Sequence, residues 1–320
     1  MDYGFNVPTG GPLANPDDIL EIVRLGEKLG FSYALVPDHI VIPSRIGSRY
    51  PYASSGEFPG NPGGACLDQL TYLAFVAAAT TRLRLLTSVM VVPHRSPVMA
   101  AKMLASLDVL SKGRLTIGCG VGWMREEFEA IGAPPFEQRG AVTDEYIEVF
   151  RDLWTSEAPV HNGPFAKYNG ISFAPKPVQK PHPPIWIGGE SGPAIRRAAR
   201  LGDGWYPIGS NPKHPLNTAD KFAAGLEKLR AAADAVDRDP ETIDLAFWGT
   251  WYDEAKGEVR TDGGRHLLTG SAADVVADVQ ALGDLGVRHL FVNLTAETKE
   301  AMTARMERFA GEVITAAGGT

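Results

Sequence analysis

Short apolar runs alternate with helical patterns along almost the whole chain, and this alternation is the feature that most limits the fold. The predicted strands are nearly continuously apolar and occupy Tyr3–Val7, Tyr33–Val36, Leu83–Val92, Leu115–Gly118, Ile185–Gly188, Trp205–Ile208, Ile243–Gly249 and Arg288–Asn293. Such strands between helices are typical of a parallel sheet covered by helices. The pattern predicts an α/β fold, a (β/α)8 TIM barrel, with a doubly wound open sheet as the alternative.

Capping residues mark the helices between these strands. Asn15 is a predicted N-cap, followed by Pro16 at the first helical position, and Gly30 ends that helix. The other predicted helices are Asp68–Thr80, Ser96–Gly113, Arg139–Trp154, Ser191–Leu201, Ala219–Val236 and Ser271–Gly286. Residues 1–320 are expected to form one domain.

Two long insertions, Pro43–Leu67 and Thr155–Pro184, interrupt the alternation. They are rich in proline and aromatic residues, and the first also in glycine and serine. Long segments without regular structure inside a compact domain are usually functional loops. We therefore expect both to be insertion loops at the C-terminal mouth of the barrel.

Charge and composition limit the partners. The formal net charge is −7, whereas nucleic acids and anionic membranes need a basic face. No run of about 18 apolar residues and no signal-peptide pattern occurs. Cys66 and Cys119 form no disulfide or metal-ligand pattern, and the histidines are scattered. We expect a soluble, cytoplasmic protein that acts on a small molecule without a metal.

A glycine run ends the fourth predicted strand, in the sequence LTIGCGVGWMREEF at Leu115–Phe128. Glycine lacks a Cβ, so the backbone here can approach a bulky, flat ligand. A tight turn without a ligand is the alternative, because the run is not a G-x-G-x-x-G fingerprint. Residues Arg125–Glu129 are expected to form a solvated helical turn, and Cys119 a small apolar filler.

Polar residues follow several of the predicted strands, where the reactive groups of an α/β barrel lie. Asp38-His39 follows the second strand and pairs a carboxylate with an imidazole suited to proton transfer. A loop histidine beside a turn-capping aspartate is the alternative. His94-Arg95 follows the third strand, and here a functional and a packing role are equally favoured.

The sequence Gly188-Gly189-Glu190-Ser191 joins the fifth strand to a helix. Backbone N–H groups, a hydroxyl and a helix N-terminus are the components of a phosphate site, although a plain helix start has them too. Trp123 and Trp205 are placed to flank a planar ligand or to pack at the barrel mouth.

Together these segments resemble the luciferase-like monooxygenase superfamily, in particular its branch of oxidoreductases that use the deazaflavin coenzyme F-420. The resemblance runs from Gly4 to at least Pro207. It is carried by VPDH at Val36–His39, LLTSVMVVPHRSPVMAAK at Leu85–Lys102, LDVLSKGRLTIGCGVGW at Leu107–Trp123, RG..TDEYIEVFRDLW from Arg139 to Trp154, PKPVQKPHPPIWIGG at Pro175–Gly189 and RRAARLGDGW at Arg196–Trp205.

The resemblance implies a TIM barrel that binds a flavin or deazaflavin at its C-terminal mouth, often as a homodimer. It implies a non-prolyl cis peptide at Ser88-Val89, forming a bulge behind the ring, and it matches His39 to the proton-handling residue of deazaflavin sugar-phosphate dehydrogenases. The expected cofactor-binding residues are Asp38, Ser88, Val89, Gly120, Gly122, Gly188, Gly189 and Ser191, and the expected substrate pocket holds Trp123, His94 and Trp205.

We therefore expect hydride transfer between coenzyme F-420 and a small organic substrate, with His39 giving or taking the proton. Those dehydrogenases have a glutamate where this chain has Trp123, which suggests an aromatic-walled pocket. The main alternative is an FMN-dependent monooxygenase; Arg45 and Arg49 favour deazaflavin, whose tail is anionic.

Two further alternatives are a glycosidase that uses Asp38 and Glu190, and a cofactor-binding barrel without catalysis. The segment Asp253–Arg265 diverges most from the family pattern. Beside it, only His266 is kept as a candidate.

Overall fold

Eight parallel strands close into a barrel in the computed structural model, which describes residues 1–60, 64–249, 257–261 and 263–318. Around the barrel the strand order is β1-β12-β9-β8-β7-β4-β3-β2. Their bounds are β1 Asp2–Asn6, β2 Tyr33–Val36, β3 Arg84–Val91, β4 Leu115–Gly120, β7 Ile185–Gly188, β8 Gly204–Tyr206, β9 Asp244–Gly249 and β12 His289–Val292. The predicted TIM barrel is thereby confirmed, and the doubly wound alternative is wrong.

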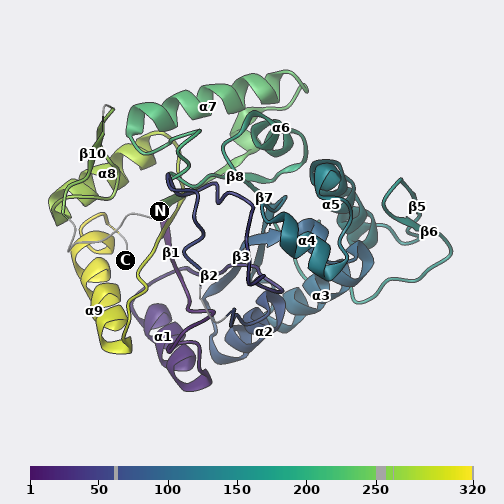
Figure 1. Ribbon diagram of the computed structural model, residues 1–320, viewed down its shortest axis with the longest axis horizontal. Coiled ribbons are helices and arrows are strands. Elements are labelled where there is room, and N and C mark those ends of the chain that lie inside the picture. Colours follow the sequence, from purple (N-terminus) through teal and green to yellow (C-terminus); the bar gives the residue numbers. More distant parts are fainter. Residues whose placement is uncertain (61–63, 250–256, 262, 319–320) are drawn as a thin grey trace.

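Helices surround the barrel and cover the outer face of its sheet (Figure 1). They are α1 Pro16–Lys28, α2 Gln69–Ala79, α3 Pro97–Leu110, α5 Arg139–Thr155, α6 Gly192–Leu201, α7 Ala219–Asp234, α8 Ala272–Asp284 and α9 Lys299–Phe309, whereas the short helix α4 Arg125–Ile131 lies in the connection from β4 to α5 at the mouth. Two predicted caps are confirmed, because Asn15 accepts a hydrogen bond from the Asp18 backbone and Ser271 forms a capping box with Asp274, whereas the side chain of Ser96 does not cap α3. Helix α9 was not predicted.

The first insertion crosses the C-terminal mouth as an irregular segment between β2 and α2 (Figure 1). Its residues 61–63 lie outside the described residues, as do 253–256 and 262 of the divergent segment Asp253–Arg265. Beyond β9, the described part of the chain forms a small hairpin, β10 Arg260–Thr261 with β11 Gly264–Arg265.

The prediction for the second insertion is wrong. Residues 155–184 connect α5 to β7, and a connection from a helix to the next strand returns to the end where strands begin. Gln179 accordingly donates a hydrogen bond to the carbonyl of Leu115, the first residue of β4. The segment forms a hairpin, β5 His161–Asn162 with β6 Lys167–Tyr168, beside α5 (Figure 1). It therefore cannot close over the mouth.

The glycine run accommodates a bulge in the neighbouring strand. The Ser88-Val89 peptide is cis, as the resemblance implied, and the β3–β4 register shifts between Thr87 and Met90. A Cβ on Gly120 would lie 2.5 Å from Val89 Cγ2, and one on Gly188 would lie 3.0 Å from Val89 Cγ1. Glycine on β4, which pairs with β3, and on β7, the next strand beyond β4, thus gives the Val89 side chain its space.

Gly118 supplies the sharpest test of this packing. An added Cβ would stand 2.2 Å from the backbone oxygen of Thr87, which no rotamer change relieves. We expect Gly118→Ala to lower the free energy of unfolding, measured by chemical denaturation, by about 1–3 kcal/mol or more. In the control Gly311→Ala, nothing lies within 4 Å of the new Cβ, so a change below about 0.5 kcal/mol is expected. Equal effects of the two substitutions would refute this account.

Candidate active site at the barrel mouth

Asp38, at the end of β2, is buried and holds the ends of two strands together. One carboxylate oxygen accepts hydrogen bonds from the Val91 backbone at 2.9 Å and from Arg95 at 2.7 Å, and the other accepts from Arg95 at 2.9 Å. Arg95 also reaches Asp68, the N-cap of α2. Both oxygens of Asp38 are therefore engaged within the protein, and contact with a cofactor remains a prediction.

His39 is paired with a carboxylate that the sequence reading placed in solvent. Its Nδ1 lies 2.9 Å from Oε2 of Glu127 on α4, and Glu127 is buried with 1% of its surface exposed. The other oxygen, Oε1, accepts hydrogen bonds from the backbone of Ile40 and Val41. The prediction of a solvated turn at Arg125–Glu129 is correct for the helix and wrong for Glu127, because this residue faces the loop that follows β2.

A second contact fastens the same loop to α4. Glu126 Oε1 accepts hydrogen bonds from the backbone of Gly47 and Ser48, at 2.8 and 3.0 Å. In return, the Arg125 backbone donates to the Ser48 hydroxyl at 3.1 Å. Helix α4 thus binds the loop at two places, near residue 40 and near residue 48.

Aromatic rings from this loop surround Trp123. The rings of Tyr50 and Phe58 lie 5.1 and 5.2 Å from the Trp123 ring, centroid to centroid, and Phe58 lies 5.1 Å from His39. Tyr52 contacts Tyr50 at 5.5 Å. We call Tyr50, Tyr52, Phe58 and Trp123 the mouth aromatic cluster. Burial in this cluster raises the pKa of Tyr50 to about 12, so its hydroxyl is protonated at neutral pH.

His94 lies behind Glu127 with its imidazole 2% exposed. Its Nδ1 is 4.0 Å from Glu127 Oε1, and within the described residues neither ring nitrogen has a hydrogen-bond partner. Its ring packs edge-on against Phe128. Because burial lowers the pKa of His94, the imidazole is neutral at neutral pH. His94 thus lies beside Glu127 and Phe128 of α4. Its predicted place in the substrate pocket remains a prediction.

The expectation for Trp205 is wrong, because its ring lies outside the barrel. It stacks on Phe222 of α7, and its indole donates a hydrogen bond to the Gly189 carbonyl. Neighbouring side chains of a strand point to opposite faces, so Tyr206 is the inward residue of β8. The hydroxyl of Tyr206 lies 2.8 Å from the hydroxyl of Ser88 at the bulge. A count of alternating faces along β8 could have identified Tyr206.

The glycine turn after β7 keeps the features of an anion site. Gly189 has φ of +106°, which favours glycine, and Ser191 precedes α6 without capping it through its side chain. The serine hydroxyl and the first N–H groups of α6 are therefore available to a ligand. Gly122 differs from these residues, because Phe128 and Val91 enclose it.

The remaining candidates have structural partners. Glu190 is buried and accepts hydrogen bonds from the Ile208 backbone and from Asn211, while Asp38 is bound by Arg95. Neither carboxylate is free for the glycosidase alternative. Cys119 is buried, as expected, and burial raises the pKa of its thiol to about 12. His266 lies beside the hairpin β10–β11, and its Nε2 is 2.8 Å from Nδ2 of Asn217.

Residues 2–252 match the family model described as luciferase-like monooxygenase. The chain belongs to the luciferase-like monooxygenase family. The resemblance in the sequence is thereby confirmed.

Two relatives and one solved structure describe its place among luciferase-like proteins. An uncharacterized protein of Mycobacterium tuberculosis is 38% identical over 231 residues, covering 70% of this chain and 80% of that protein. An FMNH2-dependent dimethylsulfone monooxygenase of Pseudomonas putida is 30% identical over 217 residues, which cover 67% of this chain and 53% of that protein. The solved structure of the coenzyme F-420 dependent tetrahydromethanopterin reductase of Methanopyrus kandleri matches with a TM-score of 0.72 at 16% identity. The match covers 98% of this chain and 99% of the reductase chain. One of these relatives thus depends on FMNH2, and a protein of the same fold depends on coenzyme F-420.

The residues at the mouth fit a flavin or deazaflavin of the kind that luciferase-like proteins bind. Val89 stands on the β3 bulge, and no side chain projects toward it from Gly120 on β4 or from Gly188 on β7. The turn Gly188–Ser191 at the N-terminus of α6 suits a phosphate. The mouth aromatic cluster covers the same end of the barrel and supplies flat apolar surface.

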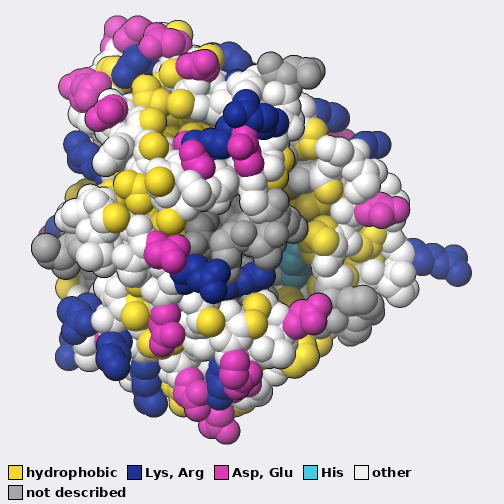
Figure 2. All heavy atoms as spheres, turned by 90° about the vertical axis from the view of Figure 1, so that its left-hand side faces the viewer, with side chains coloured by type: hydrophobic (Ala, Val, Ile, Leu, Met, Phe, Trp, Pro, Cys, Tyr) yellow, Lys and Arg dark blue, Asp and Glu magenta, His cyan; other side chains and the backbone are white. Residues whose placement is uncertain are grey.

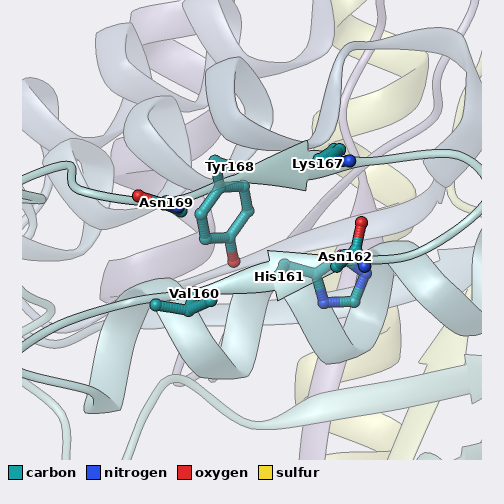
Figure 3. A pocket seen from close by; sticks show the side chains of 6 residues that line it. All are labelled: Val160, His161, Asn162, Lys167, Tyr168 and Asn169. Atoms are coloured by element: carbon teal, nitrogen blue, oxygen red, sulfur yellow. The ribbon is translucent and has the colours of Figure 1, made fainter.

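Other features lie away from the mouth. A cavity of 360 Å³ is lined by the hairpin β5–β6, where the His161 and Tyr168 side chains lie between the two strands and α5 (Figure 3).

No group of metal-binding side chains occurs among the described residues, and none of the described helices is long and apolar enough to cross a membrane. Figure 2 shows acidic and basic side chains interspersed on one face, without a broad basic surface.

Glu190 predicts a pH dependence of stability. Burial raises the pKa of its carboxyl from 4.5 to about 7, so between these values the folded protein binds more protons than the unfolded chain. Its contribution to the free energy of unfolding therefore falls as the pH rises through this window. In thermal melts, we expect the stability of Glu190→Gln relative to the unmodified protein to rise between about pH 4.5 and 7. A difference that does not vary with pH would contradict this prediction.

Proposed function

We propose that this protein is an oxidoreductase that transfers hydride between coenzyme F-420 and a small organic substrate. The observation that carries this proposal is the position of His39, between the mouth aromatic cluster and a buried carboxylate. Its Nε2 has no hydrogen-bond partner among the described residues, so it is available to a substrate. This is the arrangement that a general acid or base needs.

The chain's own residues would orient the reactants and handle the proton. Val89 supports one face of the ring, and the α6 turn at Gly188, Gly189 and Ser191 binds the phosphate. When bound, the deazaflavin supplies hydride chemistry that no side chain has. His39 would accept the hydroxyl proton of a substrate alcohol at Nε2 as the alcohol is oxidised to a carbonyl, and it would return that proton when a carbonyl is reduced.

The substrate proposed for this site is apolar or aromatic. Trp123, Tyr50 and Phe58 form flat walls beside His39, and their buried area favours an apolar ligand. Trp123 stands directly after the glycine run. A buried charged substrate would have no charged partner on these walls.

An FMN-dependent monooxygenase is the second candidate, favoured by the identity to the Pseudomonas putida protein. What supports deazaflavin is the charge of the loop over the mouth. Arg45 and Arg49 are exposed there, and Arg49 donates to the Ser54 carbonyl, which leaves its charge unneutralised. Two such cations would attract an anionic oligoglutamate tail, and added salt would weaken this attraction by screening the charges.

The proposal is tested by titrating the protein with each coenzyme and by replacing His39. We expect F-420 to bind more tightly than FMN, and high salt to weaken F-420 binding. His39→Ala should keep F-420 affinity, measured by fluorescence titration, and lose turnover with a panel of alcohols and carbonyls by about 100-fold or more. The control is His214→Ala, which alters an exposed histidine.

Three results would overturn the proposal or part of it. Tight FMN binding without F-420 binding would favour the monooxygenase. Unchanged turnover in His39→Ala would remove this residue from the proton transfer. Binding of F-420 without turnover of any tested substrate would favour the alternative of a cofactor-binding barrel without catalysis.

We also propose a homodimer that forms through α2 and α3. These neighbouring helices expose Phe75, Met99 and Leu110, the last with 70% of its surface accessible. Helix α2 contains no charged residue at all. Exposed Lys102 is on α3, but the apolar side chains named above are self-complementary, which is what a two-fold interface requires.

Charge placed on this face should separate the subunits. We expect the double variant Met99→Glu, Leu110→Glu to sediment as a monomer in analytical ultracentrifugation, because carboxylates buried against apolar surface cost several kcal/mol. Val160→Glu is the matched control, since Val160 is similarly exposed on the hairpin β5–β6. A monomeric unmodified protein, or a dimer that persists in the double variant, would contradict this proposal.

A further inference from the structure

We propose that Glu127 is a positioning residue that fixes the tautomer of His39, holding the proton on Nδ1 and presenting Nε2 as the atom that exchanges a proton with the substrate. This inference rests on the proposed function for its chemical meaning. Its geometry does not depend on which coenzyme binds.

Each oxygen of Glu127 has its own partners. Oε1 accepts hydrogen bonds from the Ile40 backbone at 2.7 Å and from the Val41 backbone at 3.2 Å. Oε2 lies 2.9 Å from His39 Nδ1. The three partners are consecutive residues of one loop. The carboxylate is therefore held in one orientation by two donors that cannot change, and the remaining oxygen faces the imidazole.

The charge of Glu127 decides where the proton of His39 lies. Burial raises the pKa of Glu127. The hydrogen bond to His39, the nearby imidazoles and the Ile40 N–H together lower it by more than burial raises it, so the net pKa is below the ordinary value. An ionised carboxylate only accepts hydrogen bonds. His39 Nδ1 must then be the donor, and the neutral ring carries a lone pair on Nε2.

The groups around this pair do not offer Nδ1 another partner. His94 approaches Oε1 only to 4.0 Å, and the nearby Asp38 carboxylate is bound by Arg95. Cys66 donates through its thiol to the His39 backbone carbonyl, not to the ring. Among the described residues, Glu127 alone contacts His39 Nδ1.

The substitution Glu127→Gln should reverse the tautomer. The Ile40 and Val41 N–H groups require an oxygen, so the amide oxygen takes the place of Oε1 and the amide NH2 faces His39. An NH2 group donates, which forces Nδ1 to accept and moves the ring proton to Nε2. The imidazole would remain in place with its proton on the wrong nitrogen.

The test is the ¹⁵N chemical shifts of the His39 ring in the protein without coenzyme, above the pH at which the ring is protonated. We expect Nδ1 to be protonated in the unmodified protein and Nε2 to be protonated in Glu127→Gln. Glu126→Gln is the matched control, because Glu126 fastens the same loop through Gly47 and Ser48 without contacting His39. In this control the unmodified pattern should persist.

Turnover provides the second readout. Glu127→Gln should lower kcat by about 100-fold or more, the range of a lost general base, and leave the affinity for F-420 unchanged. Glu126→Gln should keep most of kcat. A merely structural role for Glu127 would lower both quantities in both variants.

The outcomes separate this inference from the proposed function. A proton on Nε2 in the unmodified protein would overturn the inference even if Glu127→Gln failed to fold, and so would the same tautomer in both proteins. If the tautomer reverses but no F-420 binds, the role of Glu127 stands and the proposed coenzyme is wrong.

Discussion

The contact between Glu127 and the loop after β2 is the interaction on which the candidate site depends. One buried carboxylate accepts hydrogen bonds from three consecutive residues, His39, Ile40 and Val41. Without these donors its burial would cost several kcal/mol, and without the carboxylate the backbone N–H groups of Ile40 and Val41 would lose their hydrogen-bond partner. The mutual dependence fixes the path of the loop from its first residues. Three members of the mouth aromatic cluster, Tyr50, Tyr52 and Phe58, lie further along the same loop, and this path places them around Trp123.

The barrel contributes a second constraint: a side chain on one strand fills the space left by glycine on other strands. Val89 on β3 occupies space that exists only because Gly120 on β4 and Gly188 on β7 have no Cβ. The glycine run therefore serves the packing of the protein and the approach of a ligand at once, so its two interpretations are not alternatives. One small apolar side chain beside two glycine positions is suited to the face of a flat ring.

Periodic features were predictable from the sequence, and features that depend on one particular contact were not. The strands and most helices follow from apolar runs and from caps such as Asn15 and Ser271, whose causes are local. The burial of Glu127 depends on a loop 86 to 88 residues away in sequence, so the run Arg125–Glu129 looks like any solvated turn. Trp205 and Tyr206 are both apolar and adjacent, and only the direction of the pleat decides which faces the barrel. The place of the second insertion was knowable, since it follows a helix.

Glu127 and Glu190 are both buried at the mouth, yet their pKa values move in opposite directions, and the reason is the kind of partner. Burial penalises the charge of each. Glu190 receives one backbone N–H and one neutral amide, which do not offset the penalty, and its pKa rises to about 7. Glu127 receives two backbone N–H groups and an imidazole that can itself carry charge, and its pKa falls. The carboxylate beside His39 is consequently the one that stays ionised at neutral pH, as a group that orients a base must be. Glu190, which would be uncharged below neutral pH, is better suited to holding the β8–α7 connection than to proton transfer.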